Sequence, residues 1–149
     1  MKWLETRVPP LVVLFAAGAL AWLTPQLTLT LPGLDMAGLL IAALGVIVCG
    51  AGIAEFRRAR TTVSPVDPSA ASALVDTGIY RWTRNPMYLG MAMLLLGWTI
   101  ILGNPAGLLA VPLFQIYLNT FQIRTEEFAL RGLFGDAYIA YCARVRRWI

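Results

Sequence analysis

Five polar residues of this chain lie where long apolar stretches begin or end, and their side chains are suited to binding chemistry. Arg84, Asn85 and Tyr88 come at the start of one apolar stretch, and the adjacent acids Glu126 and Glu127 follow the next one. If the two stretches form a helical hairpin, a guanidinium, an amide, a phenol and two carboxylates meet at one end of it. Because neighbouring residues of a helix point about 100° apart, one of the two acids should face inward, where a carboxylate requires a cation.

Each of these residues also has a structural reading. Arg84 can extend its head group from a helix end to the membrane surface, and Asn85-Pro86 is an ordinary helix start, with Asn as the cap and Pro in the first turn. Tyr88 can be an interfacial aromatic residue, and the two acids can be solvated. A hairpin without a site would need only a turn and a few anchors here, so the convergence of all five residues favours a binding site.

The composition indicates a small membrane protein. Hydrophobic residues make up 58% and charged residues 13% of the 149 residues, whereas a soluble domain has about 45–50% and about 25%. A chain of this length forms one domain. It contains no histidine, which excludes histidine acid–base chemistry and most catalytic zinc or haem sites. Cys49 and Cys142 lie far apart without metal-ligand spacing, so we expect no metal site.

Four apolar stretches approach the length of about 20 residues that a helix needs to cross a bilayer. They cover residues 8–29, 34–54, 87–102 and 106–123. We expect the first to bend or fray at Pro25, the second to begin with Asp35 as its cap, and Gly103-Asn104-Pro105 to form a tight turn between the last two. The expected fold class is therefore an all-α integral membrane protein with about four transmembrane helices and a short C-terminal helical segment at the cytoplasmic interface.

The basic residues assign an orientation to these helices. All 12 Lys and Arg residues fall on one side of the four expected spans, and the two opposite loops contain none. The positive-inside rule therefore places both termini and the central loop, residues 55–80, in the cytoplasm, in a multi-pass protein of the inner or cytoplasmic membrane. Orientation explains the net charge of +4 without nucleic-acid binding. The first apolar stretch continues beyond Ala19-Leu20-Ala21, which argues against a cleaved signal peptide.

Two further patterns concern packing. In the second span the small-residue pairs Gly38/Ala42 and Gly50/Ala54 permit close contact with another helix. After the fourth span, apolar residues recur with helical spacing as far as Phe134-Gly135-Asp136, which should break the helix. Tyr138 and Tyr141 then lie three residues apart, on one face of a final short helix.

A series of short motifs begins in the central loop and continues to the last tyrosines. In chain order they are Leu74-Val75, Thr77-Gly78, Tyr80-Arg81, Arg84-Asn85-Pro86-Met87-Tyr88-Leu89-Gly90, Asn104-Pro105, Glu126-Glu127, Leu130, Phe134-Gly135, Tyr138 and Tyr141. The ordered set resembles the isoprenylcysteine carboxyl methyltransferase family, which is related to the phospholipid N-methyltransferases. The resemblance covers roughly residues 55–149, including Thr61-Thr62 and Pro65. Family members often carry proline after the last tyrosines, where this chain has Arg144-Val145-Arg146-Arg147-Trp148-Ile149.

The resemblance implies an integral-membrane enzyme that transfers a methyl group from S-adenosylmethionine to a lipophilic acceptor and leaves S-adenosylhomocysteine. The acceptor would be a lipid or another lipophilic molecule with a carboxylate, thiol, phenol or amine. The implied organisation is one methyltransferase domain over residues 1–149, with an N-terminal helix pair (1–54) and a cofactor-binding catalytic core (55–149). By the same resemblance Arg84 and Glu127 are catalytic, and the cofactor contacts are Tyr80, Arg84, Asn85, Tyr88, Leu89, Gly90, Glu126, Glu127 and Tyr138.

The chemistry of this cofactor agrees with those residues. Its ammonium suits Glu126 or Glu127, its carboxylate suits Arg84 and Asn85 through charge-assisted hydrogen bonds, and its sulfonium suits an aromatic face such as that of Tyr88. Two other functions stay open: a sterol-type membrane reductase that binds NADPH, and a non-catalytic four-helix membrane subunit. Cofactor preference separates the two enzymes, and the lack of any nucleotide-like ligand would favour the subunit.

Overall fold

The computed structural model describes residues 8–24, 32–60 and 72–149, and within these ranges all regular structure is helical. The expected all-α class is therefore confirmed for the described residues. The elements are α1 (Pro10–Leu23), α2 (Leu34–Arg58), the short 3₁₀ helix η2 (Gly78–Arg81), α3 (Pro86–Ile101), the 3₁₀ helix η3 (Pro105–Leu109), α4 (Ala110–Leu118), the π-helical turn η4 (Asn119–Ile123) and α5 (Arg124–Arg144).

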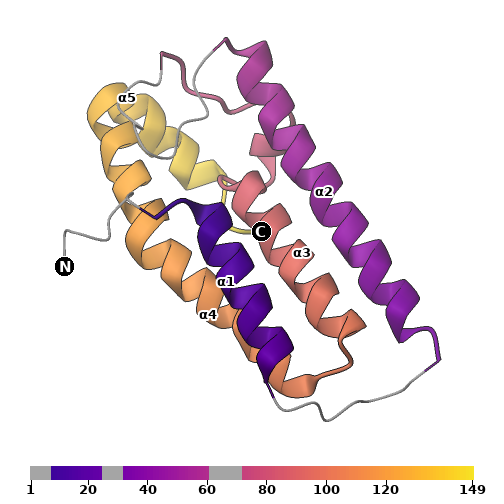
Figure 1. The fold of residues 1–149 in the computed structure, drawn as a ribbon. Coiled ribbons are helices and arrows are strands. Elements are labelled where there is room, and N and C mark those ends of the chain that lie inside the picture. Colours follow the sequence, from indigo (N-terminus) through magenta and orange to yellow (C-terminus); the bar gives the residue numbers. More distant parts are fainter. Residues whose placement is uncertain (1–7, 25–31, 61–71) are drawn as a thin grey trace.

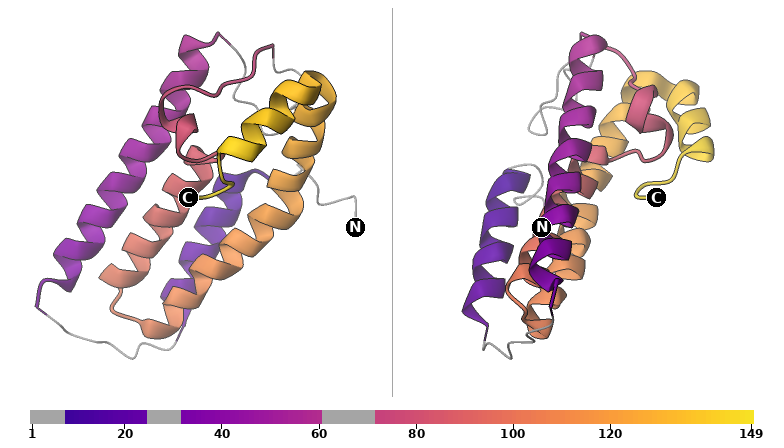
Figure 2. Two further views of the ribbon diagram at one scale, coloured as in Figure 1. Left: turned by 180° about the vertical axis from the view of Figure 1, so that it is seen from behind. Right: turned by 90° about the vertical axis from the view of Figure 1, so that its right-hand side faces the viewer.

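The long helices lie side by side and alternate in direction along the chain (Figure 1). Helix α3 packs against α2 over most of its length, and α1 contacts α3 and α4. Figure 2 shows α1 on one side of the bundle, with α5 and η2 on the other side at its upper end. The ends of α2 and α4 and the start of α3 therefore meet at this upper end, as the hairpin expected from the sequence requires.

Two of the helices are long and apolar enough to cross a membrane. These are α2 and the continuous helical run Pro105–Arg144, whereas the apolar helices α1 and α3 are shorter. With 14 and 16 residues, α1 and α3 are about 21 and 24 Å long, against a hydrocarbon core of about 30 Å. Large apolar side chains point outward from three helices: Phe15 is 74% exposed, Leu40 63% and Ile116 61%. An outer surface of this kind suits lipid contact.

Several expected boundaries differ from the structure. Helix α1 ends at Leu23, and the bend expected at Pro25 lies outside the described residues. The cap of α2 is Gly33, with a φ of 84°, and Asp35 lies inside the first turn, so the assignment of Asp35 as the cap was wrong. Helix α2 also continues beyond the expected residue 54 to Arg58. Its charged last turn lies beyond the apolar stretch, and the basic side chain of Arg58 is favourable at a helix C-terminus.

A seam of glycines brings α2 and α3 together. A Cβ atom on Gly38 would lie 2.7 Å from the carbonyl oxygen of Gly97, and one on Gly45 would lie 2.7 Å from that of Gly90. The spacing of seven residues keeps the glycines of each helix on one face. Gly38 thus lies in a close contact as expected, whereas the expectation for Gly50 was wrong, because a Cβ atom there would meet nothing within 4 Å.

The turn after α3 and the helical run that follows it determine where the two acids lie. Gly103 has a φ of 60°, and the side chain of Asn104 accepts a hydrogen bond from the backbone of Ala106 over 3.1 Å, so the predicted tight turn is present. The run from Pro105 passes through η4 without interruption and carries Glu126 and Glu127 on α5. It kinks at Gly135, where φ is 49° and ψ is −124°, as the sequence predicted.

Candidate functional site

A pocket with a cavity of about 90 Å³ lies at the upper end of the bundle, where η2, α3 and α5 meet. Its walls are apolar and aromatic, and a few charged groups project into it. The pocket is lined by Phe56, Ala73, Leu74, Val75, Tyr80, Arg84, Asn85, Met87, Tyr88, Glu126, Glu127, Leu130, Tyr138 and Tyr141. An apolar pocket with a small number of convergent polar groups is the usual form of a small-molecule site.

Tyr88 and Glu126 form the first polar pair of the pocket. Tyr88 lies in the first turn of α3, which begins with Pro86, and its hydroxyl donates a hydrogen bond to Oε1 of Glu126 on α5. The Tyr88 side chain is buried. Within the described ranges no guanidinium or ammonium pairs with Glu126, so the Tyr88 hydroxyl gives it a hydrogen-bond donor but no counter-ion.

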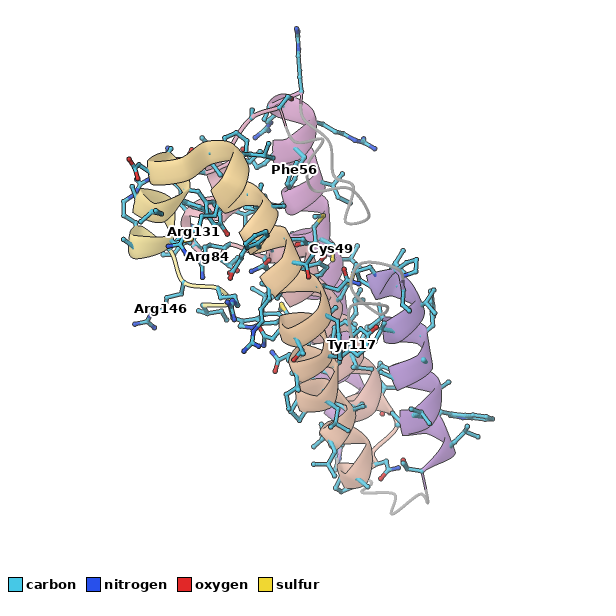
Figure 3. All side chains as sticks on the ribbon, turned by 90° about the vertical axis from the view of Figure 1, so that its left-hand side faces the viewer. Cys49, Phe56, Arg84, Tyr117, Arg131 and Arg146 are labelled. Atoms are coloured by element: carbon cyan, nitrogen blue, oxygen red, sulfur yellow. The ribbon has the colours of Figure 1, made fainter. Side chains whose placement is uncertain are left out.

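Arg84 is the central cation of the site. Its Nη2 lies 3.2 Å from Oε1 of Glu127, and its Nη1 donates to the sulfur of Cys142. Its Nε is buried and has no hydrogen-bond partner among the described residues. In Figure 3 Arg84 lies beneath α5. A buried N–H of a charged group without an acceptor is costly, so this atom marks a position where an external acceptor would be stabilised.

Glu127 is shared between two guanidinium groups. Besides Arg84, it accepts hydrogen bonds from Arg147, with Nε 3.0 Å from Oε1 and Nη2 2.6 Å from Oε2. This two-bond arrangement is the strong form of an arginine–carboxylate pair. Asn119, in the π-helical turn below, accepts from Nε1 of Trp148 over 3.2 Å. In the segment that follows α5, two adjacent side chains therefore bond to the site: Arg147 to Glu127, and Trp148 to Asn119.

Asn85 has a different task from the one that its sequence position predicted. It precedes Pro86 as the helix cap, but its side chain makes no capping hydrogen bond. Its Nδ2 instead donates to the carbonyl oxygen of Arg147 over 3.0 Å, and the Thr83 hydroxyl donates to the same oxygen over 3.3 Å. The backbone N–H of Arg84 donates to the carbonyl oxygen of Arg146 over 3.0 Å. The residues before α3 thus hold the segment after α5.

The opposite wall of the pocket is the 3₁₀ helix that carries Tyr80. The Tyr80 ring meets Phe56 of α2 edge to face at 5.4 Å, and its carbonyl oxygen accepts from the hydroxyl of Tyr141 over 2.8 Å. Thr77, just before η2, donates to Oε2 of Glu55 over 2.7 Å. Burial raises the pKa of the Tyr80 hydroxyl, so it stays protonated at neutral pH.

Seven of the nine predicted site residues line one pocket: Tyr80, Arg84, Asn85, Tyr88, Glu126, Glu127 and Tyr138. Leu89 and Gly90 are not part of its lining. Gly90 packs on α2 instead, where a Cβ atom would lie 2.5 Å from the sulfur of Cys49 and from the carbonyl oxygen of Gly45. This close packing explains why a residue without a side chain occupies the position, and the expected cofactor contact of Gly90 stays a prediction.

Arg147, Asn119 and Tyr141 contribute to the site and were not among the predicted site residues. In the sequence, the arginines at 144, 146 and 147 indicate membrane orientation and a departure from the family pattern, and their spacing does not single out Arg147. Asn119 gives no signal either, because its role depends on the π-helical turn. No cluster of three or more His, Cys, Asp and Glu side chains suited to a metal ion is present among the described residues.

The arrangement is that of a helical bundle, apolar on its outside, with a charged and aromatic pocket at one end. A family model described as phospholipid methyltransferase matches residues 34–137. The chain belongs to this family. The match begins in α2, earlier than the resemblance from residue 55 that the motifs carried, and so includes the glycine seam.

Curated relatives agree with this membership. The chain is 46% identical over 63 residues to an uncharacterised protein of Haemophilus influenzae, covering 42% of this chain and all of that protein. It is 33% identical over 79 residues to the protein-S-isoprenylcysteine O-methyltransferase of Xenopus laevis, covering 53% of this chain and 27% of the relative. With the enzyme of that name from Schizosaccharomyces pombe it shares 40% over 75 residues, 48% of this chain and 30% of the relative.

The matched regions therefore span less than a third of these two methyltransferases. No solved structure matches the chain.

Proposed function

We propose that this protein transfers the methyl group of S-adenosylmethionine to a lipophilic acceptor at the cytoplasmic face of a membrane. Membership of the phospholipid methyltransferase family and relatives named as isoprenylcysteine O-methyltransferases support the reaction class. The single observation that carries the proposal is that one pocket holds both a buried hydrogen-bond donor without an acceptor and a carboxylate without a counter-ion. Arg84 has a buried Nε without an acceptor among the described residues, and Glu126 is a carboxylate without a cation among them.

The amino-acid portion of the cofactor would supply both missing partners, an acceptor for Arg84 and a cation for the acids. Its carboxylate would accept from the Arg84 guanidinium, and its ammonium would be held by the acids of α5, Glu126 or Glu127. The rings of Tyr80, Tyr88 and Tyr138 line the same pocket and offer aromatic faces to a sulfonium cation. The residues present therefore suit a ligand that carries one anionic and two cationic groups.

The cavity is small for such a ligand. At about 90 Å³ it falls below the range of about 300–1,000 Å³ that is usual for ligand sites. Side chains that now pair with one another, foremost Arg84 with Glu127, fill part of the space between the walls. We infer that the lining side chains move apart on cofactor binding, and that the cofactor's carboxylate adds to the contacts of Arg84 without displacing Glu127.

In this reaction the protein acts by positioning the cofactor and the acceptor relative to each other. When bound, the cofactor supplies an electrophilic methyl group, which is transferred as the carbon–sulfur bond breaks and a bond to the acceptor's lone pair forms. Carboxylate, thiolate and phenolate acceptors need little help from a base. Arg84 and Glu127, expected from the sequence to be the catalytic pair, would contribute by fixing the cofactor relative to the acceptor, and alignment of two reactants can supply up to about 7–11 kcal/mol.

The membrane placement belongs to the same proposal. We infer that α1 and α3 cross the membrane together with α2 and the run from Pro105, giving four spans with both termini and the pocket on the cytoplasmic side. The basic residues of the described chain, such as Arg57, Arg81 and Arg124, agree with this orientation. Water-soluble cofactor would then reach the pocket from the cytoplasm, and the acceptor would arrive from the lipid between the helices.

Calorimetric titration of the detergent-purified protein with S-adenosylmethionine and S-adenosylhomocysteine tests the proposal, with NADPH as the comparison ligand. We expect saturable binding of both adenosyl ligands and none of NADPH. Arg84→Gln should weaken binding at least tenfold, because a charge-assisted hydrogen bond contributes about 1.5–3 kcal/mol. Arg81→Gln, which alters an exposed arginine three residues earlier, is the matched control and should bind normally.

Either of two other results would overturn the proposal. Binding of NADPH in preference to the adenosyl ligands would favour the reductase class. Folded protein that binds neither kind of ligand would favour a non-catalytic membrane subunit.

A further inference from the structure

The two adjacent acids of α5 have different surroundings, although the sequence treats them alike. Glu127 contacts the guanidinium groups of both Arg84 and Arg147. Glu126 contacts the hydroxyl of Tyr88 and, among the described residues, no cation. A third cation at Glu127 would be repelled by the two already there, whereas a cation at Glu126 would meet an unbalanced carboxylate.

We propose that the two acids have separate tasks: Glu126 binds the cationic amino group of the cofactor, and Glu127 is a positioning residue that is itself held in place by Arg147. The inference rests on the proposed function. It adds Arg147 to the residues on which the site depends. It also assigns different roles to Glu126 and Glu127, which the sequence alone does not distinguish.

The contacts of Arg147 support the positioning role. Its guanidinium fixes both oxygens of Glu127, at 3.0 and 2.6 Å, and Asn85 and Thr83 hold its carbonyl oxygen. Glu127, so oriented, holds Nη2 of Arg84 at 3.2 Å and leaves the Nε of Arg84 for a ligand. Arg147 thus acts on the cofactor through Glu127 and Arg84, and Asn85 acts through Arg147.

The neighbouring residue Arg146 shows that charge alone does not define this role. Arg146 is exposed and extends away from the bundle in Figure 3, whereas Arg147 turns inward to the acid. The two residues are adjacent and have the same side chain, so substitutions at the two positions form a matched pair.

Two ligands distinguish the tasks of the two acids. One is S-adenosylhomocysteine, and the other is its analogue with hydrogen in place of the amino group. In the wild-type protein we expect S-adenosylhomocysteine to bind about ten- to a hundredfold more tightly, as for one hydrogen bond to a charged group. In Glu126→Gln this preference should fall to within about threefold, because the charge that recognises the amino group is gone. In Glu127→Gln both ligands should weaken together and the preference should remain.

Arg147 is tested by the same pair of ligands. Arg147→Ala should weaken both ligands several-fold without changing their ratio, Arg147→Lys should restore only part of the affinity because it cannot make the two-bond pair, and Arg146→Ala should have no effect. A merely structural role would lower the melting temperature without separating the Lys variant from the Ala variant in affinity.

The outcomes are distinct from failure of the proposed function. If wild-type protein binds neither ligand, the methyltransferase proposal fails. If it binds both but Glu127→Gln, and not Glu126→Gln, abolishes the preference, only the division of tasks is overturned. If Glu126→Gln does not fold, Glu126→Asp takes its place in the experiment. It keeps the charge with a shorter reach and should retain part of the preference for S-adenosylhomocysteine. A full preference in Glu126→Asp would also contradict the proposal.

Discussion

Gly90 of α3 and Gly45 of α2 pack backbone against backbone, so closely that a Cβ atom on Gly90 would lie 2.5 Å from the carbonyl oxygen of Gly45. Neither helix could approach the other in this way with a side chain at the contact. Because Tyr88 lies two residues before Gly90, this contact also sets the depth at which the first turn of α3 enters the pocket.

Gly90→Ala should therefore destabilise the protein by about 1–3 kcal/mol, the usual cost of an added carbon in a packed contact, because backbone atoms of α2 cannot move aside. Gly50→Ala is the matched control, since a Cβ atom there meets nothing within 4 Å, and it should keep or slightly raise the stability of α2. Thermal unfolding in detergent compares the two. Equal melting temperatures would show that the glycine seam is looser than the structure has it.

Gly78→Ala should disturb the wall of the pocket that carries Tyr80. The φ of Gly78 is 55°, and a Cβ atom would lie 2.5 Å from the carboxylate of Glu55. Gly135→Ala separates the two causes, because Gly135 has a similar φ of 49° and open space around it. We expect both variants to lose stability from backbone strain, by about 1–3 kcal/mol, and only Gly78→Ala to lose affinity for S-adenosylhomocysteine as well. Normal affinity in Gly78→Ala would show that this wall does not contact the ligand.

Tyr141→Phe should loosen the packing of α5 on η2, because the Tyr141 hydroxyl donates to the buried carbonyl oxygen of Tyr80 over 2.8 Å. The expected loss is about 0.5–1.5 kcal/mol. Tyr117→Phe removes a hydroxyl from a residue of α4 whose ring packs on Phe121 at 4.9 Å, away from the pocket, and should leave the melting temperature nearly unchanged. A larger loss in the control would place the weak point of the fold in α4.

The proposed orientation predicts where reporter fusions are active. A fluorescent reporter attached after Ile149 should fold in the cytoplasm, and an enzyme that requires the external side should be active when inserted at Gly103, in the turn between α3 and η3. The positive-inside asymmetry gives this pattern. The reverse pattern at both positions would invert the topology and remove the cytoplasmic route for the cofactor.

The sequence predicted those parts of the fold that depend on neighbouring residues. Apolar length indicated the helices, Asn104-Pro105 the turn, and Gly135 the kink. It also brought Arg84, Tyr88 and Glu126 to one end, because two helices joined by a tight turn must be antiparallel. These conclusions need only helix geometry and the preferences of single residues.

The parts that the sequence did not predict depend on partners from distant segments. Gly45 becomes a contact residue only because Gly90 lies opposite it. The role of Arg147 depends on the position of Glu127, and that position depends in turn on the π-helical turn at Asn119–Ile123, where the helix changes its phase. Local patterns contain no information on any of these pairings.

The hydrogen bond from Asn85 to Arg147 joins residues 62 positions apart in the chain, and this separation affects how the protein folds. Contacts between distant segments form late, because the intervening chain must first be ordered. The helical hairpin around Gly103 can pair as soon as its second half has been synthesised. At that stage the contacts of Arg84 with Glu127, and of Glu127 with Arg147, have not yet formed. During that interval the guanidinium and the carboxylates are exposed to water, so maturation of the pocket should be the slowest step in the folding of this protein.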